Sequence, residues 1–380
     1  MPWQEWDTMS LREEFARLAC EEGSNVRQLC RRFGISPKTA YKWVGRWSDA
    51  GRGGLVDRSR RPLRSPRRTS SDVERLVLET RAEHPAWGGR KLRRVLVDRG
   101  HERIPSASTI TEILRRHGCL SEEHPSSQGP WQRFEAPCPN ALWQMDFKGP
   151  IRLLSGGLCQ PLSVLDDCTR FCLTVDACAD QRTSTVREAL TSVFRRYGLP
   201  GWVLVDNGSP WGSDAEHQYT PLRVWLIEQG VEMTHSRPYH PQTQGKIERF
   251  HRTLETELIG CRTFADLTEC RRSFEQWRMT YNLDRPHEAL GMQPPTARYR
   301  PSSREYRESI GEPEYLPGDI VRVVGEKGRI SVQGTELRAT PKAFRGKRIA
   351  LRPTNHDGLH DVFYLHHRIT QIDLRNRVAT

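Results

Sequence analysis

Three acidic residues, each in a distinctive stretch, decide the fold that we expect for the middle of this chain. The stretches are Ala141-Leu-Trp-Gln-Met-Asp146-Phe-Lys-Gly149, Trp202-Val-Leu-Val-Asp206-Asn-Gly208 and His240-Pro-Gln-Thr-Gln-Gly-Lys-Ile-Glu248-Arg-Phe250. Asp146 and Asp206 end short apolar runs that predict strands, and Glu248 lies one turn into a predicted helix. These elements can bring three carboxylates to one point, and Mg²⁺ prefers such oxygen ligands. Two such ions can activate a nucleophile and stabilise a leaving oxygen in phosphoryl transfer.

Each carboxylate also has an ordinary structural interpretation. An isolated strand aspartate commonly caps a turn, and Glu248 has Arg252 four residues later as an ion-pair partner. The Asp166-Asp167 pair is the main rival as a ligand set, and we assign it a structural role with Arg170 as a partner. The three stretches taken together nevertheless favour a shared metal site.

Residues 140–300, which surround these stretches, predict a mixed α/β core. Strands are expected at 141–148, 160–166, 171–177, 202–206 and 232–235, and helices at 183–197, 220–229, 244–259 and 264–283. A three-stranded meander followed by alternating strands and helices is typical of such a domain. Because Asn207-Gly208 is a turn dipeptide, Asp206 should project from its strand end into a loop-lined cleft.

The composition indicates several domains and a polyanionic partner. The chain has 380 residues, too many for one ordinary domain, and a net charge of +12. Residues 1–145 contain 26 Lys and Arg against 18 Asp and Glu, so 26 − 18 = +8 of that charge precedes the core. The ten cysteines form no zinc-finger pattern, which favours reduced thiols. With no apolar run of membrane-spanning length and no secretory start, we expect a soluble, cytoplasmic protein and no membrane partner.

Residues 1–50 predict a helix-turn-helix DNA-binding domain. Apolar stripes mark three helices between 9 and 48, Gly34 breaks the second stripe, and Ser36 can cap the third helix with Pro37 at its first position. The basic face of the third helix then points outward and would contact DNA. Its residues are Lys38, Tyr41, Lys42 and Arg46. The alternative is a generic helical bundle with a solvated charged face.

An arginine-rich arm follows at 51–69. This stretch of Arg, Pro, Ser and Gly cannot form a core, so it should be extended and able to follow phosphates or enter a minor groove. Six arginines are the expected DNA contacts: Arg58, Arg60, Arg61, Arg64, Arg67 and Arg68. A flexible solvated linker is the alternative interpretation.

Residues 70–120 predict a second helix-turn-helix domain. The motif His84-Pro-Ala-Trp-Gly-Gly89 interrupts its apolar pattern. Ser106 is the expected cap of its last helix, in which Ser108 and Thr109 would contact DNA. A structural or dimerising bundle is the alternative.

Two linkers and a small C-terminal domain complete the expected multidomain architecture. Residues 121–139, rich in Pro, Ser and Glu, and residues 301–314 are the expected linkers. Short alternating segments with turns between them predict a small all-β barrel at 315–380. Its exposed arginines suit DNA binding, and its apolar residues suit docking on the core, so both interpretations stay open.

These stretches together resemble bacterial insertion-sequence transposases of the Asp-Asp-Glu, retroviral-integrase-like superfamily. The resemblance is carried by residues 143–149, 165–170, 205–208, 238–254, 281–282, 285–290 and 294–295. It is specific over about 140–300, and the tandem helix-turn-helix arrangement extends it to most of the chain. The resemblance implies an RNase-H-like fold. It also implies that Asp146, Asp206 and Glu248 are catalytic and hold Mg²⁺ or Mn²⁺, with two ions per active site.

The activity that the resemblance implies is DNA transposition. Water would attack a phosphodiester at the element's end, and the freed 3′-hydroxyl would attack target DNA without a covalent enzyme intermediate. Lys246 and Arg249 would touch phosphate near the site, whereas His240 and His251 are more often structural residue types. The implied partners are double-stranded DNA, as terminal inverted repeats and as target, and further copies of the chain in at least a dimer. The expected location is the bacterial cytoplasm, at the nucleoid.

Two departures from the resemblance put a viral origin in doubt, and two alternative functions are weighed besides transposition. The interval from Asp206 to Glu248 contains 248 − 206 − 1 = 41 residues, which is long for this superfamily, and the N-terminal His/Cys zinc module of retroviral integrases is missing. One alternative is a catalytically silent DNA-binding repressor with an integrase-like fold, against which the intact acidic triad counts. The other is a nuclease for RNA–DNA hybrids, against which the two helix-turn-helix units count.

Overall fold

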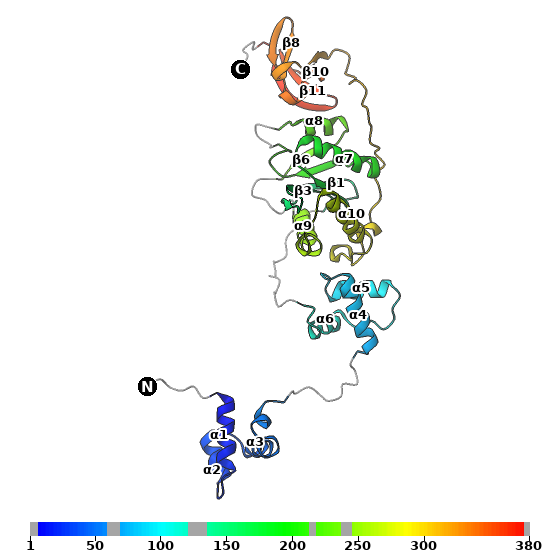
Figure 1. Cartoon of the computed structure of the whole chain (residues 1–380). Coiled ribbons are helices and arrows are strands. Elements are labelled where there is room, and N and C mark those ends of the chain that lie inside the picture. Colours follow the sequence, from blue (N-terminus) through cyan, green and yellow to red (C-terminus); the bar gives the residue numbers. More distant parts are fainter. Residues whose placement is uncertain (1–6, 59–68, 121–134, 213–217, 237–244, 376–380) are drawn as a thin grey trace, which may run out of the picture. The chain divides into compact units, whose positions relative to one another are not determined.

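The computed structural model describes residues 7–58, 69–120, 135–212, 218–236 and 245–375 (Figure 1). Two compact units are present, one ending at Arg68 and the other beginning at Thr69, and each has its own core. All ten cysteines lie in the described ranges as free thiols. None of the helices in these ranges combines the length and the apolar composition that a membrane span requires.

The first unit is a three-helix domain whose turn residues explain its helix ends. Its elements are α1 (Thr8–Ala19), α2 (Val26–Phe33), α3 (Pro37–Ala50) and the short 3-10 turn η1 (Gly51–Leu55). Gly34 ends α2 at a φ of 65°, a left-handed conformation that glycine adopts without strain. Ser36 caps α3 by accepting a hydrogen bond from the Thr39 N–H at 3.2 Å. The three predicted helices are therefore confirmed, with Phe15 and Trp43 in their core. The extended arm predicted from residue 51 is wrong at its start, because Leu55 of η1 is fully buried in the same core.

The second unit begins with three more helices. They are α4 (Ser71–Glu83), α5 (Gly89–Asp98) and α6 (Ala107–Arg116). Trp87 and Leu92 belong to the apolar cluster that the three helices share. Gly89 lets α5 approach α6 closely, because a Cβ there would lie 2.3 Å from the Ala107 carbonyl oxygen. Ser106 caps α6, as the sequence predicts.

A mixed six-stranded sheet forms the centre of the second unit. Its strands are β1 (Leu142–Phe147), β2 (Ile151–Arg152), β3 (Leu158–Asp166), β4 (Cys172–Cys178), β5 (Trp202–Val205) and β6 (Glu232–His235). β3 pairs antiparallel with β1, β2 and β4. β1 also pairs parallel with β5, and β5 pairs parallel with β6. This is the predicted meander and its parallel extension, to which the short β2 is an unpredicted addition.

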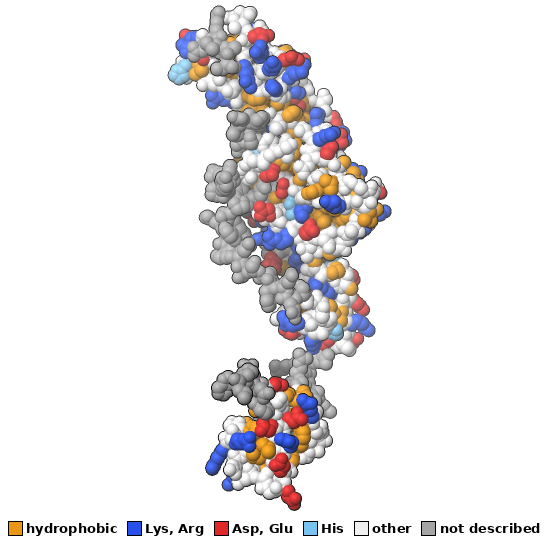
Figure 2. Space-filling view, turned by 60° about the vertical axis from the view of Figure 1, so that its left-hand side comes forward, with side chains coloured by type: hydrophobic (Ala, Val, Ile, Leu, Met, Phe, Trp, Pro, Cys, Tyr) orange, Lys and Arg blue, Asp and Glu red, His pale blue; other side chains and the backbone are white. Residues whose placement is uncertain are grey.

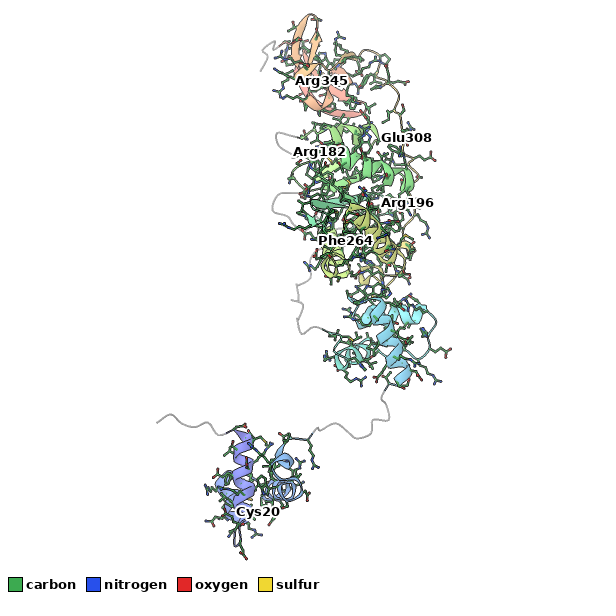
Figure 3. The ribbon with its side chains drawn as sticks, in the orientation of Figure 1. Cys20, Arg182, Arg196, Phe264, Glu308 and Arg345 are labelled. Carbon is green, nitrogen blue, oxygen red and sulfur yellow. The ribbon has the colours of Figure 1, made fainter. Side chains whose placement is uncertain are left out.

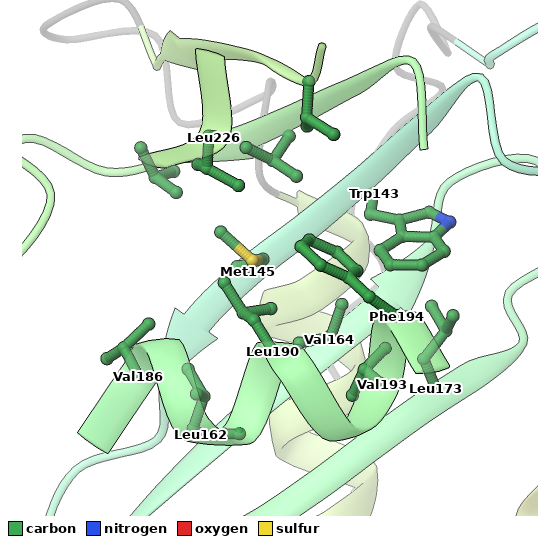
Figure 4. Packing of buried hydrophobic residues seen from close by; sticks show 14 of the residues in the cluster. Trp143, Met145, Leu162, Val164, Leu173, Val186, Leu190, Val193, Phe194 and Leu226 are labelled. Carbon is green, nitrogen blue, oxygen red and sulfur yellow. The ribbon is translucent and has the colours of Figure 1, made fainter. Parts of the chain in front are cut away.

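Helices cover both faces of this sheet and give it two separate cores (Figure 1). They are α7 (Thr183–Tyr197), α8 (Pro221–Glu228), α9 (Gly245–Glu257) and α10 (Leu267–Leu283). On one face Trp143 and Met145 of β1 pack with α7 and α8 residues such as Leu190 (Figure 4). On the other face α9 and α10 pack over β3 and β4. Because side chains alternate along a strand, Gln144 and Asp146 point to the α9 side.

The chain crosses back over the core after its last α-helix. The Leu199 N–H donates a hydrogen bond to the Arg304 carbonyl oxygen at 2.7 Å. Farther along, Glu308, which is labelled in Figure 3, accepts a hydrogen bond from the Arg195 guanidinium at 2.6 Å. Residues 301–314, predicted as a linker, are therefore held against the core as far as Glu308.

The C-terminal domain is an open sheet and a hairpin, and the predicted closed barrel is not confirmed. The sheet has the order β12 (His367–Asp373), β11 (Leu359–Tyr364), β10 (Arg348–Pro353) and β7 (Ile320–Val323), and the hairpin pairs β8 (Arg329–Val332) with β9 (Thr335–Arg338). No strand closes this sheet among the described residues. Helix α8 explains the difference, because Val224 and Ile227 complete the apolar core of the domain. Lys and Arg side chains gather over its surface (Figure 2).

Polar contacts also hold the C-terminal domain on α8. The Tyr364 hydroxyl donates to Glu228 Oε1 at 2.6 Å, and Lys347 Nζ lies 2.5 Å from the same oxygen. The Tyr219 hydroxyl lies 2.9 Å from His367 Nε2. The structure thus shows docking on the core, while DNA binding by this domain stays a prediction.

Candidate active site

Strand register brings the two predicted aspartates side by side. β1 and β5 run parallel with Gln144 opposite Leu204. Continued by two residues, the same register places Asp146 opposite Asp206, where the two strands end. Adjacent strands lie about 4.8 Å apart, so these carboxylates meet although they are distant in sequence.

The two aspartates repel each other inside a partly buried site. The pKa of Asp146 is raised to about 7, first by burial and then by the negative charges of Asp206 and Glu248. Burial also raises the pKa of Asp206. Asp206 Oδ1 is buried without a hydrogen-bond partner among the described residues. Because a buried anion without partners costs free energy, the site favours a cation between the carboxylates.

Glu248 reaches this site from the first turn of α9. Its side chain is exposed, whereas Ile247 and Phe250 on either side of it along the helix are buried. The negative charge of Glu248 contributes to the raised pKa of Asp146, so the two carboxylates lie near each other. The structure therefore places Asp206, at the end of β5, and Glu248, on α9, near Asp146 of β1.

Three polar contacts align α9 along β1. They join alternate residues along β1 and just after its end to every fourth residue of α9. The contacts are Gln144 Oε1 to the Ile247 N–H at 3.1 Å, Asp146 Oδ2 to His251 Nδ1 at 3.7 Å and Lys148 Nζ to Glu255 Oε2 at 3.0 Å. Two strand residues advance about 6.7 Å and four helix residues about 6 Å, so the two repeats match. This match holds Glu248 in register with Asp146.

The rival pair Asp166-Asp167 has structural partners. Asp166 accepts hydrogen bonds from the Asn140 N–H at 2.7 Å and the Thr169 N–H at 2.8 Å. Asp167 is fully buried and accepts a hydrogen bond from the Lys246 ammonium at 2.5 Å. These contacts occupy both carboxylates and agree with the structural role that the sequence indicates. The expected partner Arg170 instead places its guanidinium 3.1 Å from Glu135.

Lys246 is engaged inside the protein rather than directed at solvent. Its Nζ contacts both the carboxylate and the carbonyl oxygen of Asp167, and only 16% of its side chain is exposed. A phosphate contact by Lys246 would compete with this ion pair. Arg249, by contrast, is exposed on α9. Phosphate contact stays a prediction for both residues.

His251 is a site neighbour that sequence reasoning left as a structural residue. It is buried on α9, beside Asp146. Burial, together with the positive charge of Lys148, lowers the pKa of His251 to about 4, so its ring is neutral at neutral pH. The sequence signal that could have placed it there is its spacing. His251 follows Ile247 by four residues and so lies on the buried stripe of α9, which faces the sheet.

The donors suit a divalent cation, although they need adjustment to hold one. Within the described residues, no three His, Cys, Asp or Glu side chains are arranged to hold a metal ion as they stand. Asp146 and Asp206 nevertheless offer hard carboxylate oxygens. Among the described residues, Asp206 Oδ1 has no hydrogen-bond donor, so it is available to a cation. Glu248 is exposed and can rotate toward them at low cost. Such a set can support hydrolysis or transfer at a phosphodiester.

The predicted DNA contacts of the first unit lie on the outer face of α3. Lys38, Tyr41 and Lys42 are exposed, Tyr41 to 63%. Arg46 is half-buried, with its guanidinium 5.1 Å from the centre of the Trp43 ring. Lys42 Nζ lies 3.9 Å from the same ring. The face is therefore accessible and basic, and DNA contact stays a prediction for its residues.

The remaining predicted DNA contacts are only partly described. Arg58 is exposed at the end of the first unit. The other arginines of the arm lie outside the described residues: Arg60, Arg61, Arg64, Arg67 and Arg68. In α6 Ser108 is exposed, whereas the Thr109 hydroxyl lies 2.9 Å from Ser106 Oγ. The structure tests DNA contact at none of these positions.

Known protein families match most segments of the chain. Two families described as Integrase core domain match residues 136–241 and 229–295. The C-terminal domain of IS481 family transposases matches residues 319–380. A helix-turn-helix domain family matches residues 11–62, and a homeodomain-like domain family matches residues 39–114.

Two insertion-element proteins are among the similar curated proteins. An uncharacterized 39.2 kDa protein of insertion element IS476 from Xanthomonas euvesicatoria is 31% identical over 167 residues, 43% of this chain and 46% of that protein. An uncharacterized 31.7 kDa protein of insertion element IS407 from Burkholderia multivorans is 28% identical over 232 residues, 58% of this chain and 78% of that protein. The match thus spans about half the length of the first relative.

Similar solved structures have low sequence identity to this chain. A chain of the simian T-cell lymphotropic virus intasome in complex with PP2A regulatory subunit B56 gamma is 16% identical, with a TM-score of 0.38 and coverage of 79% of this chain and 99% of that chain. The HTLV-2 integrase catalytic core domain in complex with magnesium is 14% identical, with a TM-score of 0.34 and coverage of 44% of this chain and 100% of that chain.

Proposed function

Because this chain belongs to the bacterial insertion-sequence transposases of the retroviral integrase superfamily, we propose that it cuts and joins DNA at the ends of an insertion sequence. The observation that carries the proposal is the meeting of Asp146 and Asp206 at adjacent strand ends, with the charge of Glu248 acting on Asp146. All three residues lie within the segments that match integrase core families.

We assign the three acidic residues the role of holding two Mg²⁺ or Mn²⁺ ions. When bound, such ions activate the attacking hydroxyl and stabilise the leaving oxygen. Asp146 and Asp206 stand at the ends of hydrogen-bonded strands, so their positions are rigid. Glu248 completes the set from α9. The neutral, buried ring of His251 excludes water from one side of Asp146 without adding a competing charge.

The proposed reaction has two balanced steps. In the first, a water oxygen bonds to phosphorus at the element's end, and the 3′ oxygen leaves as a hydroxyl. In the second, this 3′-hydroxyl attacks a phosphodiester of the target DNA, so one P–O bond forms as another breaks. Because the number of phosphodiester bonds is unchanged in the second step, joining needs no external energy source.

We propose a division of labour along the chain. Residues 1–50 and 70–120 bind the terminal inverted repeats, residues 51–69 contact phosphates between them, and residues 140–300 perform the chemistry. The net charge of +8 over residues 1–145 supports this assignment. Two element ends must reach one target, so the working form contains at least two copies of the chain.

A catalytically silent DNA-binding repressor is the second candidate function. The observation that favours it is that the described acidic side chains are not arranged as a ready metal site. The presence of all three predicted carboxylates, and their mutual proximity, favour the transposase.

The test uses the full chain with Mg²⁺, a labelled duplex carrying the DNA ends that flank its gene, and a plasmid target. Asp146→Asn, Asp206→Asn and Glu248→Gln should each abolish joined product while retaining end binding. Glu188→Gln, at an exposed position on α7, is the matched control and should join like the wild type. End binding without joining by the wild type would support the repressor. Joining by Glu248→Gln would show that another residue completes the site.

A further inference from the structure

Trp87, in the motif that interrupts the second helical unit, contacts the catalytic core. Its side chain is 2% exposed and stacks on the His84 ring at a centroid distance of 3.7 Å. Its indole Nε1–H donates a hydrogen bond to Glu257 Oε1 at 3.2 Å. The motif therefore places one aromatic residue between the α4–α6 helices and the core.

Glu257 is a junction with hydrogen-bond donors from three segments. Besides Trp87, its Oε1 accepts a hydrogen bond from Arg285 Nε at 2.9 Å, and its Oε2 accepts one from Trp277 Nε1 at 3.1 Å. The side chains of Glu257 and Arg285 are each only 10% exposed. Because a buried carboxylate is costly without such partners, loss of one donor should loosen this junction.

The junction lies on the same helix as the proposed catalytic glutamate. Glu248 is in the first turn of α9, and Glu257 is its last residue. The separation of nine positions, 257 − 248 = 9, corresponds to about 14 Å along the helix axis. The α4–α6 helices are thus attached to the far end of the element that carries Glu248.

We propose that Glu257 and Trp87 are positioning residues that set a fixed distance between DNA bound by α4–α6 and the active site. The proposal rests on the proposed function, and it makes α9 a spacer that selects which phosphodiester is cut. The two surfaces that meet belong to the same chain. The α4–α6 unit contributes the indole N–H of Trp87, and the core contributes the buried carboxylate of Glu257.

A nearby exposed ion pair provides a matched control. Arg90, on α5, lies 3.1 Å from Glu288, and the two side chains are 72% and 55% exposed. Exposed pairs of this kind contribute little to stability. Arg90→Gln therefore removes a contact between the same two parts of the chain without touching the buried junction.

The test compares Trp87→Phe, Glu257→Gln and Arg90→Gln in the full chain. Glu257→Gln keeps the side-chain shape while removing the charge, so it isolates the junction; Trp87→Phe keeps an aromatic ring but removes the indole N–H together with part of the buried ring system. Hydrogen exchange of α5 amides, measured without DNA, should become about tenfold faster in Trp87→Phe and Glu257→Gln, as expected for one lost hydrogen bond to a charged group. On end DNA with Mg²⁺, the same two variants should cut at several neighbouring positions, whereas the wild type and Arg90→Gln cut at one.

The outcomes separate this proposal from the proposed function. Faster exchange with an unchanged single cut would overturn the positioning role, and unchanged exchange would show that the junction does not hold α4–α6. If the wild type makes no cut, the proposed function fails and the positioning role fails with it. The exchange measurement would still report whether the junction exists.

Discussion

Replacing Asp146 by asparagine should stabilise the folded protein even though it abolishes catalysis. Burial, followed by repulsion from the neighbouring carboxylates, raises the pKa of Asp146 from an ordinary value of 3.8 to about 7, and its side chain is 24% exposed. Because one pKa unit corresponds to about 1.36 kcal/mol, the ionised carboxylate costs the folded state up to about 4 kcal/mol. Asparagine keeps the shape and removes that charge.

The sign of the pH dependence follows from linkage. The folded chain binds the Asp146 proton more tightly than the unfolded chain, so ionisation destabilises the folded state as the pH rises. The cost begins near pH 3.8, grows through pH 7 and is constant above it. The gain in free energy of unfolding from Asp146→Asn should therefore be about 4 kcal/mol at pH 8 and about 2 kcal/mol at pH 5.

The assay is urea denaturation at both pH values, with unfolding monitored by tryptophan fluorescence. Asp72→Asn is the control, because that side chain is 80% exposed and its loss should change stability by less than about 1 kcal/mol. Added Mg²⁺ should raise the wild-type midpoint more than that of the variant, since a cation relieves the same repulsion. Equal midpoints for wild type and Asp146→Asn at pH 8 would refute the inference that the carboxylates meet.

Three further predictions concern packing, docking and recognition. Phe264→Ala should lower the free energy of unfolding by about 3 to 5 kcal/mol in urea denaturation, because that ring is fully buried, and a loss below about 1 kcal/mol would contradict its place in the core. Tyr364→Phe removes a hydrogen bond to Glu228 and should cost about 1 to 3 kcal/mol, detected as faster hydrogen exchange across the C-terminal sheet; unchanged exchange would assign the docking to apolar contacts alone. Lys38→Ala and Lys42→Ala should each weaken binding to the element's end more than to random DNA in competition assays, whereas equal losses would assign both residues to phosphate contact.

Local patterns account for most elements of the core. The helix predicted at 183–197 and the strand predicted at 232–235 coincide with α7 and β6. Apolar periodicity is clear in both. Gly198 follows the last residue of α7, and Gly230 lies in the turn before β6; both have positive φ angles. The short strand β2 was missed because two residues carry no period that could be recognised.

Contacts between distant segments set the limits of sequence reasoning at the site. Nothing local shows that Asp146 lies beside Asp206, because that depends on the order of β1 and β5 in the sheet. The three acidic stretches taken together, and then the family resemblance, suggested a shared site. Lys246 has a position that suits phosphate contact, but its partner Asp167 is 79 residues away in sequence. Likewise, the alternating pattern of the C-terminal strands is compatible with a barrel. The sequence does not show that Val224 and Ile227 of α8 pack into the core of that domain.

The sharing of α8 between two apolar cores has a consequence for how the chain is made. Leu222 and Leu226 turn toward the central sheet, while Val224 and Ile227 belong to the core of the C-terminal domain. A ribosome that has just finished α8, at residue 228, must add 364 − 228 = 136 residues before β11 is complete. At about 5 to 20 residues per second this takes roughly 7 to 27 s. During that time Val224 and Ile227 of the nascent core form an exposed apolar patch that other chains can contact. In a fragment that ends at residue 300, this patch would stay exposed.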